Sequence, residues 1–266
     1  MYQHTVYDDN YNKQHQYDFA DKQSKGLFLT KVFGIMFLCL AITTVVAAGL
    51  GYGLMFLLMQ TATKDSEGAI VAYDPNIVYT MVGLLIGSAV ILIIMSFVLP
   101  IMFIRGKHNI IVPLMIYVTV MGVMLSSLTW TLEPIILVEG FGITALIFGL
   151  MAFLGFISKG RLTGVWVVAI GLLVGAGILS LINFLMIMTG LIGDAYITIS
   201  WIVSLMVFGF LMLMTMWDVH RISAIAGNAS ESGNNLVYYC AYILYSDFIA
   251  ILIRVLRILA ILARRR

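Results

Sequence analysis

Two aspartates, Asp218 and Asp247, lie in long apolar stretches of the sequence. A carboxylate at the middle of a bilayer costs about 2.5–3.5 kcal/mol on insertion scales, so such residues usually pair, titrate or line a water-filled path. Asp218 lies nine residues before a polar turn that begins at Gly227, and Asp247 lies twelve residues after that turn ends at Asn235. Two antiparallel helices rising about 1.5 Å per residue would bring the two carboxyl groups to depths that differ by only about 5 Å.

Two carboxyl groups at one level in poorly hydrated surroundings cannot both ionise easily, so the pair can hold one shared proton. The protonated pair forms a hydrogen-bonded clasp between two helices. Loss of the shared proton at higher pH leaves two like charges that repel each other. A divalent cation could replace the proton, since carboxylate oxygens suit calcium. Asp218 and Asp247 are therefore a candidate pH sensor and gate, and also candidate calcium ligands. The alternative for Asp218 alone is a helix cap or a solvated side chain.

Three further ionisable residues need a reason for their positions. Arg254 follows Asp247 by seven residues on the same predicted helix face, where it can pair with a carboxylate or extend to the interface. Arg105 ends an apolar stretch and is either an anchor at the membrane surface or a counter-charge to the aspartate pair. Glu139 lies five residues after Pro134 and is either interfacial or pore-lining.

The composition shows which elements position these residues. Of 266 residues, 62% are apolar or aromatic and 11% are Asp, Glu, Lys or Arg, against about 25% charged residues in soluble proteins. This excludes a soluble enzyme of ordinary composition and indicates a membrane protein. The net charge of +2 gives no support for nucleic acid as a partner.

Apolar runs long enough to cross a bilayer recur along the chain, and because backbone groups in lipid must be hydrogen-bonded internally, we expect helices. We predict an all-α membrane protein, with a flexible cytoplasmic tail over residues 1–31 and a seven-transmembrane-helix bundle over residues 32–266. The seventh segment contains Asp247, Arg254 and Arg257, so we place it at the centre of the bundle, shielded by the other six. The runs are Val32–Met59, Ile77–Ile104, Ile110–Leu132, Ile135–Ile157, Gly164–Leu191, Ala195–Trp217 and Leu236–Ala263.

Charge asymmetry predicts the orientation. Nine Lys and Arg residues fall in the amino-terminal tail and the loops on its side, against one in the loops on the other side, which places the amino terminus in the cytoplasm. The side of Arg264, Arg265 and Arg266 stays open, because the seventh segment can span the membrane or re-enter it. Glycine pairs four residues apart, Gly83/Gly87 and Gly171/Gly175, predict close helix contacts.

The motifs around the aspartates resemble those of the Bax inhibitor-1 family, also called the transmembrane Bax inhibitor motif family, and the resemblance suggests a bacterial member. The matching segments are Met216-Trp217-Asp218, Leu244-Tyr245-Ser246-Asp247-Phe248-Ile249, Leu256-Arg257 and Val138-Glu139-Gly140-Phe141-Gly142-Ile143-Thr144. Trp217 stands where tyrosine is usual, and Ala250 stands where asparagine is common. The likeness runs from about Leu27 to Leu262.

The resemblance implies a pH-sensitive calcium leak channel in the bacterial plasma membrane, gated by Asp218 and Asp247, with Arg105 assisting the closed state. Calcium is then a permeant or bound ion, and no other cofactor is expected. An alternative is a non-transporting regulator that binds another membrane protein, such as the membrane protease FtsH, with which some bacterial relatives are associated. Two aspartates on adjacent helices could also belong to an intramembrane aspartyl protease. Tyr245-Ser246-Asp247 lacks the Gly-x-Gly-Asp pattern of such proteases, so we expect no enzyme.

Overall fold

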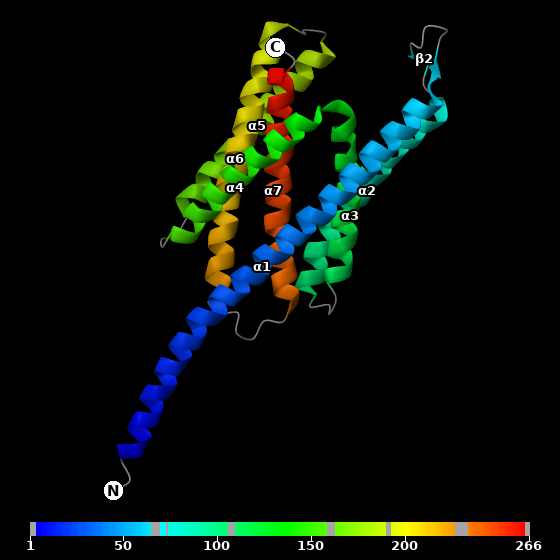
Figure 1. Cartoon of the computed structure of the whole chain (residues 1–266). Helices are drawn as coiled ribbons and strands as arrows, with labels where there is room; N and C mark the ends of the chain where they lie inside the picture. The colour runs from blue at the N-terminus through cyan, green and yellow to red at the C-terminus, as the bar shows by residue number, and fades with distance from the viewer. Residues whose placement is uncertain are drawn as a thin grey trace. The chain divides into compact units, whose positions relative to one another are not determined.

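The structure is a computed structural model that describes residues 4–64, 70–72, 74–105, 110–158, 163–189, 193–226 and 234–263. These residues form seven α-helices and one short antiparallel pair of strands (Figure 1). The helices are α1 (His4–Thr61), α2 (Pro75–Ile104), α3 (Ile111–Thr131), α4 (Pro134–Ile157), α5 (Thr163–Met188), α6 (Asp194–Ala226) and α7 (Asn234–Ala263), and the strands are β1 (Thr63–Lys64) and β2 (Ile70–Ala72).

The helices agree with the apolar runs of the sequence, and α6 continues past Trp217 to Ala226 as expected. The structure differs at the amino end, where α1 begins at His4 although we expected no regular structure over residues 1–31. Extending an existing helix is inexpensive compared with nucleating one, so the apolar part of α1 can propagate helix into the polar segment before it. The cytoplasmic placement of this segment stays a prediction. The turn at 227–233 and Arg264–Arg266 lie outside the described residues.

Side chains fix two of the helix boundaries. Asp74 caps the start of α2, where its Oδ1 atom accepts a hydrogen bond of 2.9 Å from the backbone N–H of Asn76, and Pro75 follows at the first helical position. Pro134 likewise opens α4, and two residues separate it from the end of α3. Proline suits this position because its missing N–H would have no partner in the first turn of a helix.

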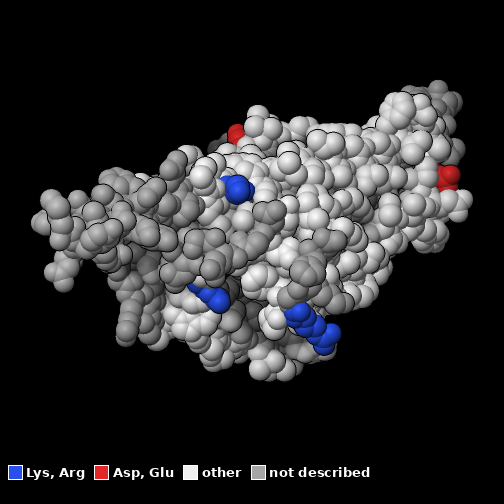
Figure 2. Space-filling model, turned by 90° about the horizontal axis from the view of Figure 1, so that it is seen from below, with Lys and Arg blue, Asp and Glu red and all other residues white. Residues whose placement is uncertain are grey.

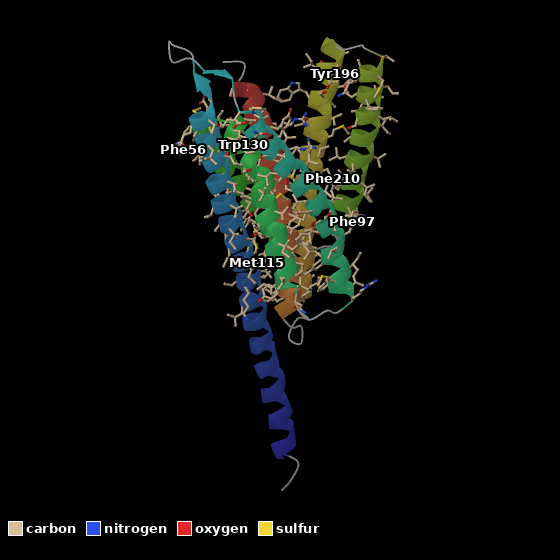
Figure 3. All side chains as sticks on the ribbon, turned by 90° about the vertical axis from the view of Figure 1, so that its right-hand side faces the viewer. Phe56, Phe97, Met115, Trp130, Tyr196 and Phe210 are labelled. Atoms are coloured by element: carbon tan, nitrogen blue, oxygen red, sulfur yellow. The ribbon has the colours of Figure 1, made fainter. Side chains whose placement is uncertain are left out.

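The protein is an all-α membrane protein. Among the residues that the structure describes, six helices are long and apolar enough to cross a membrane. Their outward side chains are large and apolar, including Phe56 (62% exposed) and Phe97 (67% exposed), which are labelled in Figure 3. On the face in Figure 2, the described surface carries few charged side chains. Such a surface is stable against lipid and unstable against water.

The described chain divides into two compact units. Unit 1 comprises Met1–Phe33, Thr144–Gly233 and Ser246–Arg254, and unit 2 comprises Gly34–Ile143, Asn234–Tyr245 and Val255–Arg266. In unit 1, α5 and α6 form an antiparallel hairpin (Figure 1). In unit 2, α2 and α3 pack side by side, and the rings of Phe103 on α2 and Tyr239 on α7 stack with centroids 4.1 Å apart.

Unit 2 is also held together where α1 and α3 approach closely. The indole N–H of Trp130 donates a 3.0 Å hydrogen bond to the backbone carbonyl of Gly51. A Cβ at Gly51 would collide with the side chain of Thr129, and a Cβ at Gly122 would collide with Val46. Two glycines facing the opposite helix therefore allow the backbones to come together.

The charged helix α7 is the most enclosed. It carries more buried apolar residues than any other described helix, and it supplies residues to both units. Tyr245 and Ile251 are wholly inaccessible to solvent. This agrees with the expected central position of the seventh segment, because a helix that contains Asp247, Arg254 and Arg257 is costly to leave facing lipid.

Candidate functional site

The structure brings Asp218 and Asp247 together in unit 1, as their spacing predicts. Their carboxyl groups lie within hydrogen-bonding reach of each other, one from α6 and one from α7. Asp218 is buried, with 9% of its surface exposed, and Asp247 is partly buried. A hydrogen bond between two carboxyl groups requires one proton, since two carboxylates offer acceptors only.

One carboxyl oxygen of this pair has no further partner. The Oδ2 atom of Asp247 is enclosed and accepts no hydrogen bond from the part of the chain that the structure describes. A buried oxygen without a partner costs about 1–3 kcal/mol, more for a charged group. A proton or a cation bound at this oxygen would remove that cost, so the site favours binding one of them.

Close helix packing holds the pair in place. Thr215, one turn before Asp218, is fully buried, and its hydroxyl group donates a 3.0 Å hydrogen bond to the carbonyl of Leu211. Across the unit, Gly155 of α4 faces the backbone of α6 so closely that a Cβ would collide with the carbonyl oxygen of Met216. The backbone that carries Asp218 is thus packed directly against α4.

Aromatic contacts fix α7 beside α4 next to the site. The rings of Phe148 on α4 and Phe248 on α7 meet edge to face, with centroids 5.5 Å apart. Phe248 directly follows Asp247 in the sequence. The rings of Phe148 and Phe248 are both buried. Such a pair contributes about 0.5–1.5 kcal/mol beyond its buried area and restricts the rotation of α7 at the site.

A cationic side chain and two indole rings from α5 and α6 form a cluster. The guanidinium carbon of Arg221 lies 5.4 Å from the centroid of the Trp217 ring, which is within cation–π range. Trp217 in turn lies against Trp166 of α5, with ring centroids 4.8 Å apart. Arg221 follows Asp218 by three residues on α6, and side chains at this spacing on a helix are neighbours. This cluster was not predicted from the sequence, although the spacing of Trp217 and Arg221 by four residues on one helix is a signal for it.

The other predicted charged residues are Arg105, Glu139 and Arg254. Arg105 is exposed at the end of α2, and Glu139 is exposed on α4; both belong to unit 2, whereas the aspartates belong to unit 1. Arg254 is partly buried on α7 in unit 1. The roles of Arg105 as counter-charge and of Glu139 and Arg254 as pore-lining residues stay predictions.

A second buried polar network, in unit 2, was not predicted. The hydroxyl groups of Thr43 on α1 and Tyr245 on α7 lie 2.6 Å apart, and the Thr43 hydroxyl is also within reach of the carbonyls of Cys39 and Val118. Tyr117 of α3 packs edge to face on Tyr245, with ring centroids 6.1 Å apart. Thr43 and Tyr245 are separated by about 200 residues, so no local pattern in the sequence joins them.

The aspartate pair could bind calcium only weakly by itself. Calcium takes six to eight oxygen ligands, and two carboxyl groups provide at most four. Among the described residues, no group of three or more His, Cys, Asp or Glu side chains could hold a metal ion. The carboxyl oxygens suit a hard cation that keeps part of its water shell.

Comparison with known proteins shows the family to which the chain belongs. The family model described as inhibitor of apoptosis-promoting Bax1 matches residues 26–264. None of the curated proteins matches the chain. The matched range includes all seven helices from the apolar part of α1 onward, together with both aspartates. The chain therefore belongs to the Bax inhibitor-1 family of membrane proteins.

Proposed function

We propose that the protein is a pH-sensitive calcium leak channel, gated by the carboxyl pair of Asp218 and Asp247. The observation that carries this proposal is the close approach of two carboxyl groups, within hydrogen-bonding reach of each other, on different helices of an integral membrane protein. One shared proton closes the pair. Release of that proton produces like charges, which favour separation of α6 and α7 and attract a divalent cation.

The direction of the pH response follows from this charge balance. At low pH the shared proton is present, the clasp is intact and the leak is closed. At higher pH the proton leaves, and the charge repulsion opens the path. The proton and calcium compete for the same oxygens, so calcium is both the transported ion and a ligand of the open pair.

We place the protein in a bacterial plasma membrane, as the resemblance to bacterial family members suggests. The distribution of Lys and Arg places its amino terminus in the cytoplasm. Arg105, Glu139 and Arg254 are proposed to assist as gate counter-charge and pore-lining residues. The partners are then the lipid bilayer, calcium and protons. A membrane protease such as FtsH is the partner in the alternative role of a non-transporting regulator.

Calcium flux in proteoliposomes tests the proposal. The purified protein is reconstituted with a calcium-sensitive dye inside the vesicles, and influx is measured across a series of pH values. We expect influx to rise with pH, and we expect vesicles that contain the Asp247→Asn variant to show no pH dependence. Absence of flux at every pH, together with co-purification of a stoichiometric membrane partner, would replace the channel by the regulator.

A further inference from the structure

We propose that Arg221, together with Trp217 and Trp166, binds the phosphodiester group of an anionic lipid at one surface of the membrane. Such binding goes beyond the proposed function, because it does not depend on a calcium path. The guanidinium carbon of Arg221 lies 5.4 Å from the centroid of the Trp217 ring, and the rings of Trp217 and Trp166 have centroids 4.8 Å apart. One cation and two indole rings from two helices of unit 1 thus form a single cluster.

The cluster lies at the level where the hydrocarbon core of a bilayer ends. Helices α5 and α6 run antiparallel (Figure 1), and both indole rings lie about equally far from the turn that joins these helices. The span Gly164–Met188 has 25 residues, which is about 37 Å of helix against a hydrocarbon core of about 30 Å. Trp166, two residues from the start of this span, therefore falls near the boundary with water, where tryptophan is enriched in membrane proteins.

Arg221 extends the cluster beyond this boundary. It lies four residues after Trp217, about 6 Å further along α6, which continues to Ala226. Arg221 is exposed and Trp166 is 37% exposed, so both can contact a molecule outside the protein. Long cationic side chains near the ends of spanning helices place their charge at the level of the lipid headgroups.

The guanidinium group suits a phosphate. It has five N–H donors, and contact with one ring can occupy only part of them. Phosphate oxygens accept two parallel hydrogen bonds from such a group. Asp218, the nearest carboxyl group in the sequence of α6, is buried, whereas Arg221 is exposed. Helix α5 and the part of α4 in unit 1 contain no Asp or Glu, so these two helices bring no carboxylate to neutralise Arg221.

The two indole rings favour a lipid over a free phosphate ion. Tryptophan packs its apolar surface on the upper part of an acyl chain while its polar edge stays near water. In a lipid the acyl chain is attached next to the phosphate, so the rings and Arg221 can bind one molecule together. The ammonium group of a zwitterionic lipid would bring a second positive charge close to Arg221 and weaken the attraction. The cluster therefore fits an anionic lipid.

Native mass spectrometry of the full chain tests this proposal. The protein in detergent receives equal amounts of phosphatidylglycerol and phosphatidylcholine, and the ratio of the two lipid adducts is measured. We expect this ratio to fall about fivefold in Arg221→Gln, because one arginine near a membrane surface contributes about this factor toward anionic lipid. Arg257→Gln is the matched control, since Arg257 is also exposed and its loss changes the net charge equally. The control should keep the wild-type ratio, and an equal fall in both variants would overturn the proposal.

Two further variants separate charge from position. Trp217→Leu should lower the ratio by about twofold, because it removes the ring against which Arg221 is held. Arg221→Lys keeps the charge and should keep most of the preference for phosphatidylglycerol. A fall in Arg221→Lys as large as that in Arg221→Gln would contradict binding through the positive charge.

Quenching of tryptophan fluorescence in bilayers shows where the lipid binds. Lipids brominated near the headgroup end of their chains quench tryptophans close to them, and we expect brominated phosphatidylglycerol to quench the wild type more strongly than brominated phosphatidylcholine. This difference should shrink in Arg221→Gln and persist in Arg257→Gln. Equal quenching by both lipids in the wild type would reduce the cluster to a general interfacial anchor and overturn the proposal. Displacement of the phosphatidylglycerol adduct by millimolar inorganic phosphate would also overturn it, in favour of a soluble phosphate ligand.

Discussion

The carboxyl groups of Asp218 on α6 and Asp247 on α7 are within hydrogen-bonding reach of each other, and the Oδ2 atom of Asp247 has no partner in the described part of the chain. Such an arrangement is stable with one proton between the two groups and unfavourable without it, because two enclosed negative charges then face each other. A site with these two protonation states can respond to pH by itself.

Replacing either aspartate by asparagine should remove the pH response of calcium influx. Asparagine cannot ionise, so the Asp218→Asn and Asp247→Asn variants lose the repulsion that opens the pair. Influx measured in proteoliposomes should be flat across pH in both. Asp74→Asn serves as a matched control, because asparagine caps a helix as well as aspartate does, and it should keep the wild-type profile. A wild-type profile in Asp247→Asn would remove the pair from the mechanism.

Calcium should compete with the shared proton. By linkage, a tenfold rise in calcium should lower the pH midpoint of the pair by up to about one unit if one ion displaces one proton. Magnesium should shift it less, since magnesium gives up its water reluctantly. The midpoint of the carboxylic acid infrared band, measured at several concentrations of each ion, checks this. A midpoint that does not depend on calcium would show that the ion does not bind to the pair.

The hydroxyl pair of Thr43 and Tyr245 should stabilise unit 2. Tyr245→Phe removes one buried hydrogen bond, and we expect the free energy of unfolding to fall by about 1 kcal/mol. Thr43→Val should cost about 1–3 kcal/mol, because it leaves the buried Tyr245 hydroxyl without its partner. Unfolding in detergent micelles measures both. The double variant should lose less than the sum of the two, and strict additivity would mean that the hydroxyl groups do not interact.

Gly155 should be intolerant of a side chain. Gly155→Ala puts a Cβ into the carbonyl oxygen of Met216, and we expect a loss of about 1–3 kcal/mol from overpacking. Gly149, also on α4, has nothing within 4 Å of such a Cβ among the described residues, so Gly149→Ala should be neutral or stabilising by up to about 1 kcal/mol. Thermal unfolding of the two variants in detergent compares them. Equal melting temperatures would contradict the close approach of α4 and α6.

The sequence was sufficient for the helices and for the aspartate pair, since both depend on regular spacing. Apolar runs must form helices in lipid. Two aspartates nine and twelve residues from one turn reach depths that differ by only about 5 Å on antiparallel helices. The long helical start of α1 at His4 was not predictable in this way, because its polar residues carry no apolar period and the helix is extended from its neighbour.

Close contacts between helices were predicted less well. A Cβ added at Gly83, Gly87 or Gly171 would have no described atom within 4 Å, whereas one added at Gly175 would meet the side chain of Met206. The glycines that allow backbone approach include Gly51 and Gly155, which belong to no motif identified in the sequence. Spacing shows which residues share a helix face, but the face that meets another helix depends on the whole arrangement of helices.

The central claim is that loss of the shared proton opens the calcium path, and one paired titration tests it most directly. In the same reconstituted preparation, the carboxylic acid band is followed by infrared spectroscopy while calcium influx is recorded across pH. We expect a single midpoint for both signals in the wild type. In Asp218→Asn and Asp247→Asn, one carboxyl group remains without its acidic partner, so the band should titrate at a different pH and influx should not follow it. Influx that rises with pH while the band stays unchanged, or a band that titrates without any change in influx, would contradict it.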